Sequence, residues 1–192
     1  MPEARVYKQT PGEAQRNLWD VGCGRQEEIS PSSLGEAILW YKHSNMSKVS
    51  AYYHIVFCTK NREKTIPLNY KNDLYGYIWS LIRELKCSLV RIGGVENHFH
   101  VLVNLNPTVS LSDFVRSIKA KSSIWLNSDS RFPLFKGWAA EYFACTVAPE
   151  NKDGLITYIR DQEVHHQCKP IASELETLYR AAELSYHPKD MM

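Results

Sequence analysis

Short runs of β-branched and aromatic residues alternate along this chain with longer stretches in which apolar residues recur every three or four positions. The first pattern indicates strands and the second indicates helices. We expect strands at 52–59, 88–95, 98–103 and 142–147, and helices at 67–85, 110–125, 154–166 and 171–184. The order strand, helix, strand, strand, helix, strand predicts an α+β fold. It is a ferredoxin-like βαββαβ antiparallel sheet with helices on one face and an additional C-terminal helix that bears Tyr158.

Local signals place two of these elements. Ser110 stands three residues before Asp113, which is the signature of a helix start capped by a serine side chain. The predicted buried face of that helix consists of Leu111, Phe114, Val115, Ile118, Ser122 and Trp125. Only a few residues separate the second strand from the third, so these two strands should pair as an antiparallel hairpin.

Residues 1–45 differ from the rest of the chain. Proline and glycine interrupt them repeatedly, and no apolar period lasts beyond a turn or two. We expect a disordered leader, or upstream sequence read from a misassigned start codon, with Met46 as a natural start of the folded unit. Residues 46–168 should form the main domain, and 169–192 a C-terminal helix with a short, frayed tail.

Composition and charge narrow the class of protein. The 192 residues suffice for one good core, and 44% of them are hydrophobic. The sequence has neither an apolar run of membrane-spanning length nor a signal-peptide pattern, which predicts a cytoplasmic protein. The five cysteines are widely spaced and are expected to be reduced packing residues. Residues 46–136 carry 13 Lys and Arg against 6 Asp and Glu, which suits a nucleic acid, although a solvated basic face gives the same pattern.

The His98-Phe99-His100 stretch carries the first chemical signal. Alternate residues of a strand share a face, so the two imidazoles look out the same way, roughly 6–7 Å apart along the strand. That spacing lets both close on one metal ion, while Phe99, Val101 and Val103 anchor the opposite face. Two half-exposed strand histidines would give the same pattern, so the pair needs partners elsewhere.

Tyr158 and Gln162 lie four residues apart on one predicted helix and therefore point to one face. Docked over the histidine strand, that face brings an amide oxygen and a phenol to the two imidazoles. Two nitrogens and a carbonyl oxygen leave open positions on a divalent ion for a substrate phosphate. The tyrosine can then act as a nucleophile and conserve the energy of a phosphodiester as phosphotyrosine. Taken singly, a packing role for Tyr158 and a surface position for Gln162 are the simpler interpretations.

Four motifs together resemble the HUH single-tyrosine transposases of the insertion-sequence 200/605 type, the IS200-like family. They are residues 53–57 (YHIVF), residues 96–103 (ENHFHVLV), Trp138 four residues before Tyr142, and residues 158–163 (YIRDQE). The resemblance covers about 46–168 and implies a ferredoxin-like fold. It also implies that His98, His100 and Gln162 bind a metal ion and that Tyr158 is the nucleophile. The functional unit implied is a homodimer, in which Tyr158 can complete the site of the partner subunit.

The activity that the resemblance implies is metal-dependent cleavage and rejoining of single-stranded DNA, that is, transposition of an insertion sequence. Tyr158 attacks the scissile phosphate, forms a 5′-phosphotyrosine link and frees a 3′-hydroxyl, without ATP. Mg²⁺ is the expected ion, and Mn²⁺ also suits imidazole ligands. The expected partner is single-stranded DNA with hairpins near the element ends, in a bacterial cytoplasm and without a membrane.

The helix predicted at 110–125 offers a surface for a phosphate backbone. Arg116 and Lys119 lie three residues apart and share a face with Ser123, and together with Lys121 they are the candidate DNA-binding residues. A solvated helix face is the alternative. His165 and His166, one to two turns beyond Tyr158, either lie at the surface or assist DNA or metal binding.

Three other functions stay open. A domesticated relative that processes repeated palindromes uses the same chemistry and differs only in its flanking DNA. A non-catalytic nucleic-acid-binding module of the RNA-recognition type would expose aromatic residues where the hairpin strand here exposes His98 and His100. A degenerate copy would bind DNA without cutting it, although all four key residues are present.

Overall fold

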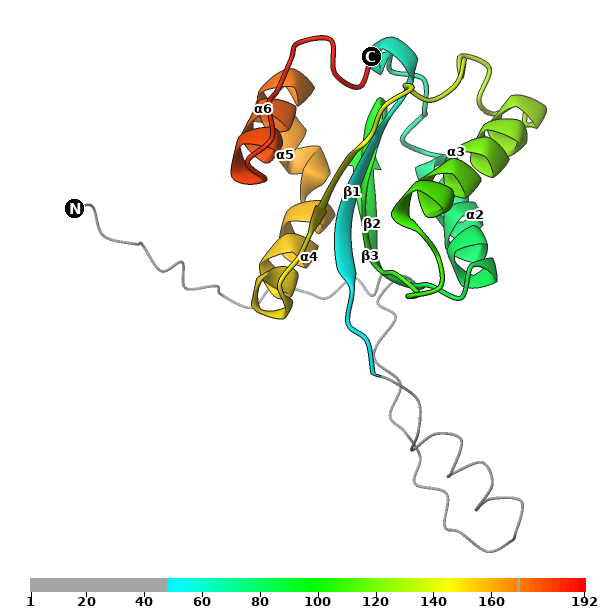
Figure 1. The fold of residues 1–192 in the computed structure, drawn as a ribbon. Helices are drawn as coiled ribbons and strands as arrows, with labels where there is room; N and C mark the ends of the chain where they lie inside the picture. The colour runs from blue at the N-terminus through cyan, green and yellow to red at the C-terminus, as the bar shows by residue number, and fades with distance from the viewer. Residues whose placement is uncertain (1–47, 169) are drawn as a thin grey trace, which may run out of the picture. The chain divides into compact units, whose positions relative to one another are not determined.

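The computed structural model describes residues 48–168 and 170–192, without the side chains of residues 167 and 168. The expectation of a disordered or misassigned leader at 1–45 lies outside the described residues. Within them the chain forms one sheet with helices on both faces (Figure 1). No helix in this part of the chain is long and apolar enough to cross a membrane.

The sheet contains four strands, namely β1 (Tyr52–Cys58), β2 (Ser88–Val95), β3 (His98–Asn104) and β4 (Phe143–Thr146). Their order is β2-β3-β1-β4, and every neighbouring pair is antiparallel. The predicted hairpin is the β2-β3 pair, and the strands with the most continuous apolar sequence, β1 and β3, are central. Each helical connection crosses one intervening strand, which is βαββαβ connectivity. The predicted α+β fold with an antiparallel sheet is therefore confirmed.

Two helices, α2 (Lys71–Glu84) and α3 (Leu111–Ser128), cover one face of the sheet (Figure 1). The main core lies between them and the strands, and its largest fully buried members are Phe57, Phe99, Phe114, Ile55, Leu74, Ile78, Ile82, Ile118 and Leu126. The Ser110 hydroxyl accepts a hydrogen bond from the Asp113 backbone amide at 3.1 Å, so the predicted helix start is confirmed.

Three helices, α4 (Lys152–Arg160), α5 (Gln162–Cys168) and α6 (Ile171–Ala181), cover the opposite face (Figure 1). Two 3₁₀ turns, η1 (Lys60–Arg62) and η2 (Pro149–Asn151), precede α2 and α4. The prediction of a single helix at 154–166 is wrong, because the backbone of Asp161 (φ −93°, ψ 16°) ends α4 before α5 begins. Tyr158 and Gln162 therefore belong to two helices that meet at a turn.

A second, smaller core lies between α6 and the sheet. Its buried members are Val56, Cys58, Ala139, Phe143, Leu175, Tyr179 and Met191. Met191 is fully buried, and its backbone amide donates to the Glu141 carboxylate at 2.9 Å. The expectation of a frayed tail is therefore wrong, because the end of the chain packs against this second core.

The helix that carries Tyr158 approaches the sheet closely at one glycine. A Cβ added at Gly93 of β2 would lie 2.2 Å from the backbone oxygen of Ile159 and 3.0 Å from its Cγ2 atom. Ile159 is fully buried and follows Tyr158 directly. The absence of a side chain at Gly93 therefore sets how near the Tyr158 helix lies to the sheet.

Replacing Gly93 by alanine is expected to push α4 away from the sheet, because the atom in the way belongs to the backbone. The free energy of unfolding should fall by about 1–3 kcal/mol, as in other overpacked interfaces. Urea unfolding measures this change. Gly154→Ala is the matched control on the same helix, because a Cβ there meets no atom within 4 Å. An equal loss of stability in the two variants would contradict the role of Gly93.

Candidate active site

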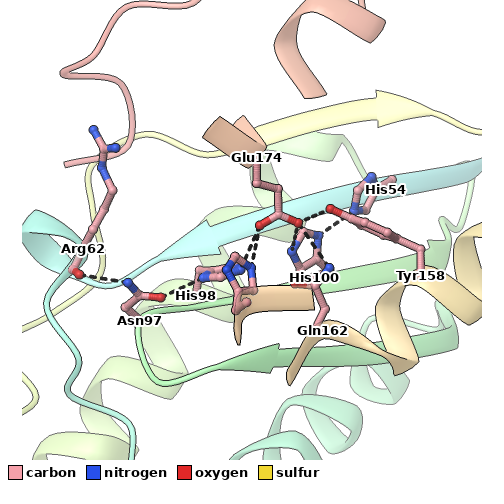
Figure 2. A network of polar contacts seen from close by, with 9 residues as sticks. His54, Arg62, Asn97, His98, His100, Tyr158, Gln162 and Glu174 are labelled. Atoms are coloured by element: carbon pink, nitrogen blue, oxygen red, sulfur yellow. Dashed lines mark hydrogen bonds and ion pairs between the residues drawn. The ribbon is translucent and has the colours of Figure 1, made fainter. Parts of the chain in front are cut away.

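The imidazoles of His98 and His100 lie side by side on β3, facing α4, α5 and α6 (Figure 2). Their ring centroids are 5.2 Å apart, and neither side chain has any exposed surface. The alternative of half-exposed strand histidines is therefore wrong. The alternate residues Phe99, Val101 and Val103 point into the main core, as predicted from the strand period.

Each of these two histidines has a polar neighbour at its Nδ1 atom. His98 Nδ1 lies 2.8 Å from the Asn97 side-chain oxygen, and the Asn97 amide nitrogen donates to the Arg62 carbonyl at 3.1 Å. Because the Asn97 oxygen can only accept, His98 carries its proton on Nδ1. His100 Nδ1 lies 2.9 Å from Nε2 of His54, whose ring stacks on it with a centroid distance of 5.2 Å. Both Nε2 atoms are thereby directed away from the sheet toward the helices.

Burial lowers the pKa values of two imidazoles in this cluster, those of His54 and His98. It lowers the pKa of His54 to about 3, and the neighbouring His100 acts in the same direction. It also lowers the pKa of His98 to about 4, although the nearby Glu174 carboxylate opposes the change. A neutral imidazole with its proton on Nδ1 has a free lone pair on Nε2, which is the form that binds a metal ion.

Tyr158 and Gln162 both reach the histidine pair from the helices, as the sequence predicts. The Tyr158 ring lies edge-on to His100, with centroids 5.7 Å apart, and its hydroxyl donates a hydrogen bond to the Glu174 carboxylate. Gln162 is 1% exposed, and its Nε2 donates to Glu174 Oε1 at 3.1 Å. Burial and the adjacent carboxylate raise the pKa of the Tyr158 phenol. The turn at Asp161 does not separate the two side chains, since both meet one carboxylate.

Glu174 on α6 occupies the centre of this cluster (Figure 2). Only 1% of it is exposed, and its oxygens lie 3.4 Å from His98 Nε2, 3.3 Å from His100 Nε2 and 2.7 Å from His166 Nε2. Burial alone would raise the pKa of Glu174, yet the imidazoles of His100, His166 and His98 hold it below its ordinary value. The cluster therefore contains an ionised carboxylate that the sequence analysis missed.

A signal for Glu174 does exist in the sequence. The apolar stripe of α6 runs through Ile171, Leu175, Leu178 and Tyr179, and position 174 falls on the same face. A glutamate on the apolar stripe of an amphipathic helix is a buried charge, which is rare without a partner. His166 also belongs to the cluster, since its ring lies 4.5 Å from that of His98, so it is not simply a surface residue.

The donor set of this cluster fits a divalent metal ion. Among the described residues, the buried atoms without a hydrogen bond include His98 Nε2, His100 Nε2, Gln162 Oε1 and Glu174 Oε2. The nitrogens and carboxylate oxygens of His98, His100 and Glu174 lie within 4.8 Å of one another. Two imidazole nitrogens with amide and carboxylate oxygens suit a divalent ion such as Mn²⁺. Because an ion satisfies several such atoms at once, it removes the cost of leaving them unpaired.

Residues 47–162 match the family model described as Transposase IS200 like. The chain belongs to the IS200-like transposase family. The match includes both histidines of β3, Tyr158 and Gln162, and it confirms the resemblance drawn from the four motifs. Glu174 lies beyond the matched residues.

Two solved structures are similar to this IS200-like family member. One, from Deinococcus radiodurans R1, is described as a candidate transposase; it is 22% identical, with 62% of this chain and 95% of that chain covered and a TM-score of 0.49. The other is described as a REP-associated tyrosine transposase bound to a REP hairpin; it is 15% identical, with 63% and 74% covered and a TM-score of 0.49. No curated protein matches the sequence.

The three candidate DNA-binding residues lie on α3, across the sheet from Tyr158 (Figure 1). Arg116 is exposed and pairs with Asp113 at 2.8 Å, and Lys121 is exposed and pairs with Glu84 at 2.6 Å. The expectation that Lys119 shares an exposed face with Arg116 is wrong, because Lys119 is half-buried and its ammonium donates to the carbonyls of residues 139 and 140 at 2.5 and 2.8 Å. The predicted contact with DNA stays a prediction for all three. Lys119 also holds the loop before β4.

A surface hollow of about 390 Å³ borders the cluster. It is lined by Lys64, Leu68, Val95, Glu96, Asn97, Glu163, His166, Pro170 and Ile171. Asn97 and His166 also contact His98, so the hollow reaches the edge of the site. The hollow therefore borders the site of this family member, while His98 itself has no exposed surface.

Proposed function

We propose that the protein cleaves and rejoins single-stranded DNA through a covalent 5′-phosphotyrosine at Tyr158, in the transposition of an insertion sequence. The observation that carries this proposal is the position of Tyr158, in a chain of the IS200-like family. Its ring packs on His100, inside a buried cluster of imidazole, amide and carboxylate groups. A phenol beside such a donor set has the geometry of a nucleophile next to a metal site.

Tyr158 performs the bond exchange in this proposal. Its Oη atom attacks the scissile phosphorus, the new O–P bond forms, and the bond from phosphorus to the 3′-oxygen breaks. The phenolic proton is released to solvent as Oη attacks, and the departing 3′-oxygen takes up one proton from solvent and becomes a free hydroxyl. When that hydroxyl, or another, attacks the phosphotyrosine, the strands are rejoined and the tyrosine is released. The energy of the phosphodiester is conserved throughout, so no ATP is needed.

His98, His100 and Gln162 hold a divalent ion in this proposal, with Mg²⁺ expected and Mn²⁺ a suitable substitute. Such an ion supplies Lewis-acid catalysis by drawing charge from a phosphate oxygen. The protein's own contribution is orientation: Asn97 and His54 fix the two imidazoles, and the backbone of β3 sets their spacing.

His54→Phe tests this orienting role. The phenyl ring keeps the stacking volume but removes the nitrogen that contacts His100 Nδ1, so we expect Mn²⁺ binding to weaken about 10–100-fold. Titration of Mn²⁺ followed by electron paramagnetic resonance measures the affinity. His54→Gln is the matched variant, because its side-chain oxygen can still accept from His100, and it should bind more tightly than His54→Phe. Equal affinities in wild type and His54→Phe would count against the role.

The proposed substrate is single-stranded DNA with hairpin ends. The basic span 46–136 supplies positive charge for a phosphate backbone, and the exposed Arg116 and Lys121 are candidate contacts. Since α3 lies across the sheet from Tyr158, these side chains would hold a part of the DNA away from the scissile bond.

The homodimer implied by the family resemblance is a further part of the proposal. Tyr158 lies beside His100 of its own chain, so we expect a site completed in cis. A mixture of Tyr158→Phe and His100→Ala proteins should then form no adduct with DNA. If the mixture regains adduct formation, the tyrosine works in the partner's site, because only a shared site combines the two intact halves.

The proposal is tested with labelled single-stranded DNA that carries a hairpin from the protein's own locus. The expected result on a denaturing gel is a covalent adduct that forms with Mg²⁺ and is absent when Mg²⁺ is chelated. No adduct, but a tight metal-independent shift on a native gel, would instead support a non-catalytic binding module or an inactive copy.

A further inference from the structure

Glu174 brings a negative charge into the interior without an obvious counter-charge. Its side chain is 1% exposed, and it enters the cluster from α6, beyond the residues matched to the family. Its ion-pair partners among the described residues are three imidazoles, of His98, His100 and His166. None of them carries the permanent positive charge of a Lys or Arg. A buried carboxylate is strongly unfavourable when its charge is not compensated.

The contacts between Glu174 and the β3 histidines are longer than charge-assisted hydrogen bonds. A charge-assisted N–H···O bond measures about 2.7–2.9 Å, whereas His98 Nε2 and His100 Nε2 lie 3.4 and 3.3 Å from the Glu174 oxygens. Because the Nδ1 proton of His98 is directed to Asn97, its Nε2 presents a lone pair to a carboxylate oxygen. Two lone pairs that face each other repel, unless a cation lies between them.

We propose that Glu174 is a ligand of the divalent ion, together with His98, His100 and Gln162. The inference rests on the metal site of the proposed function and adds a carboxylate from a helix outside the matched family region. A carboxylate supplies the charge that two neutral imidazoles and an amide lack, and the four groups give mixed N and O coordination suited to Mg²⁺ or Mn²⁺. The ion thereby becomes a link between the sheet and α6.

Glu174 also connects this site to the nucleophile. Its Oε1 accepts from both the Tyr158 hydroxyl and Gln162 Nε2, while Oε2 lies 2.7 Å from His166 Nε2 and 3.4 Å from His98 Nε2. One oxygen thus positions Tyr158, and the other lies between two imidazole nitrogens, on the side where the ion would bind. Glu174 acts as a positioning residue for Tyr158 through the first oxygen. Gln162 donates to the same oxygen, and its own Oε1 is buried without a hydrogen bond among the described residues.

Glu174→Gln tests the proposal, because it keeps the shape and removes the charge. We expect Mn²⁺ affinity, measured by paramagnetic resonance titration of the full chain, to fall at least tenfold. In chelator, the melting temperature should stay the same or rise, because a buried charge has been removed. The rise in melting temperature on adding Mn²⁺ should shrink. Glu176→Gln, an exposed glutamate on the same helix, is the matched control and should change none of these quantities.

Two results would overturn the proposal. If Glu174 merely fills the site in place of an ion, Glu174→Gln should bind Mn²⁺ as tightly as wild type or more tightly. If it forms a structural ion pair, the variant should melt several degrees lower in chelator with unchanged Mn²⁺ affinity. If Glu174→Gln fails to fold, hydrogen exchange of the wild-type protein provides the test. Mn²⁺ should slow the exchange of the α6 amides, and unchanged exchange would reject the link between the ion and α6.

The failure of this inference is distinguishable from failure of the proposed function. If wild-type protein binds no Mn²⁺ and forms no DNA adduct, the proposed metal site is rejected altogether. If wild-type protein does both and the Glu174→Gln variant binds Mn²⁺ with unchanged affinity, the proposed transposase chemistry stands and only the fourth ligand is rejected.

Discussion

The Tyr158→Phe variant is expected to form no covalent adduct with single-stranded DNA while still binding it. The substitution removes only the oxygen of the proposed nucleophile, and the ring keeps its edge-on contact with His100. Loss of a nucleophile lowers turnover by at least about 10³-fold, because the remaining groups cannot form the covalent intermediate. A denaturing gel with labelled DNA measures the adduct, and a native gel measures binding, for which less than a threefold change is expected.

Tyr142→Phe is the matched control for this experiment. Tyr142 stands just before β4 and packs against the main core, away from the histidine pair, so its loss should leave adduct formation near the wild-type level. If Tyr158→Phe still forms the adduct, the nucleophile is another residue. The double variant then shows whether Tyr142 is that residue.

Replacing His100 by alanine is expected to abolish cleavage and weaken Mn²⁺ binding by more than about 100-fold. There are two reasons: the variant loses one of the proposed ligand atoms, and it leaves His54 without the ring that His54 contacts. Paramagnetic resonance titration measures the affinity, and the adduct assay measures cleavage. Chelation of the wild-type protein should reproduce the loss of cleavage.

Stability must be separated from metal binding, because His100 is fully buried and its removal opens a cavity. Val101→Ala is the matched control: it shortens the next residue of β3, which is also fully buried but faces the main core. That variant should lose stability and keep its Mn²⁺ affinity. Cleavage by His100→Ala in chelator at the wild-type rate would remove metal from the mechanism.

The fold follows from local patterns and could be predicted from the sequence. Alternation along β3 fixes which face receives His98 and His100, and the Ser110 cap fixes where α3 begins. The break at Asp161 escaped prediction, because the helical apolar period continues across it and only the packing of α5 reveals the turn. The packing of the tail could not be predicted for a similar reason, since the burial of Met191 depends on a core built by distant strands.

The site residues that belong to sequence motifs could be predicted, whereas the residues that join the site through packing could not. His98, His100, Tyr158 and Gln162 stand in recognisable order, and the structure brings all four together. The roles of His54 and Glu174 depend on long-range placement. His54 reaches His100 only through the β1-β3 register, in which Val56 pairs with His100 and His54 is its diagonal neighbour. Glu174 reaches them only because α6 folds back over the sheet.

The most direct test of the central claim is to identify the residue that becomes attached to DNA. Wild-type protein is incubated with hairpin-bearing single-stranded DNA and Mg²⁺, the DNA is trimmed with nuclease, and the peptides are analysed by mass spectrometry. We predict a nucleotide linked through its 5′-phosphate to Tyr158. This linked nucleotide should be absent when Mg²⁺ is chelated. A nucleotide on any other residue, or an equal yield without a divalent ion, would contradict metal-dependent catalysis by Tyr158.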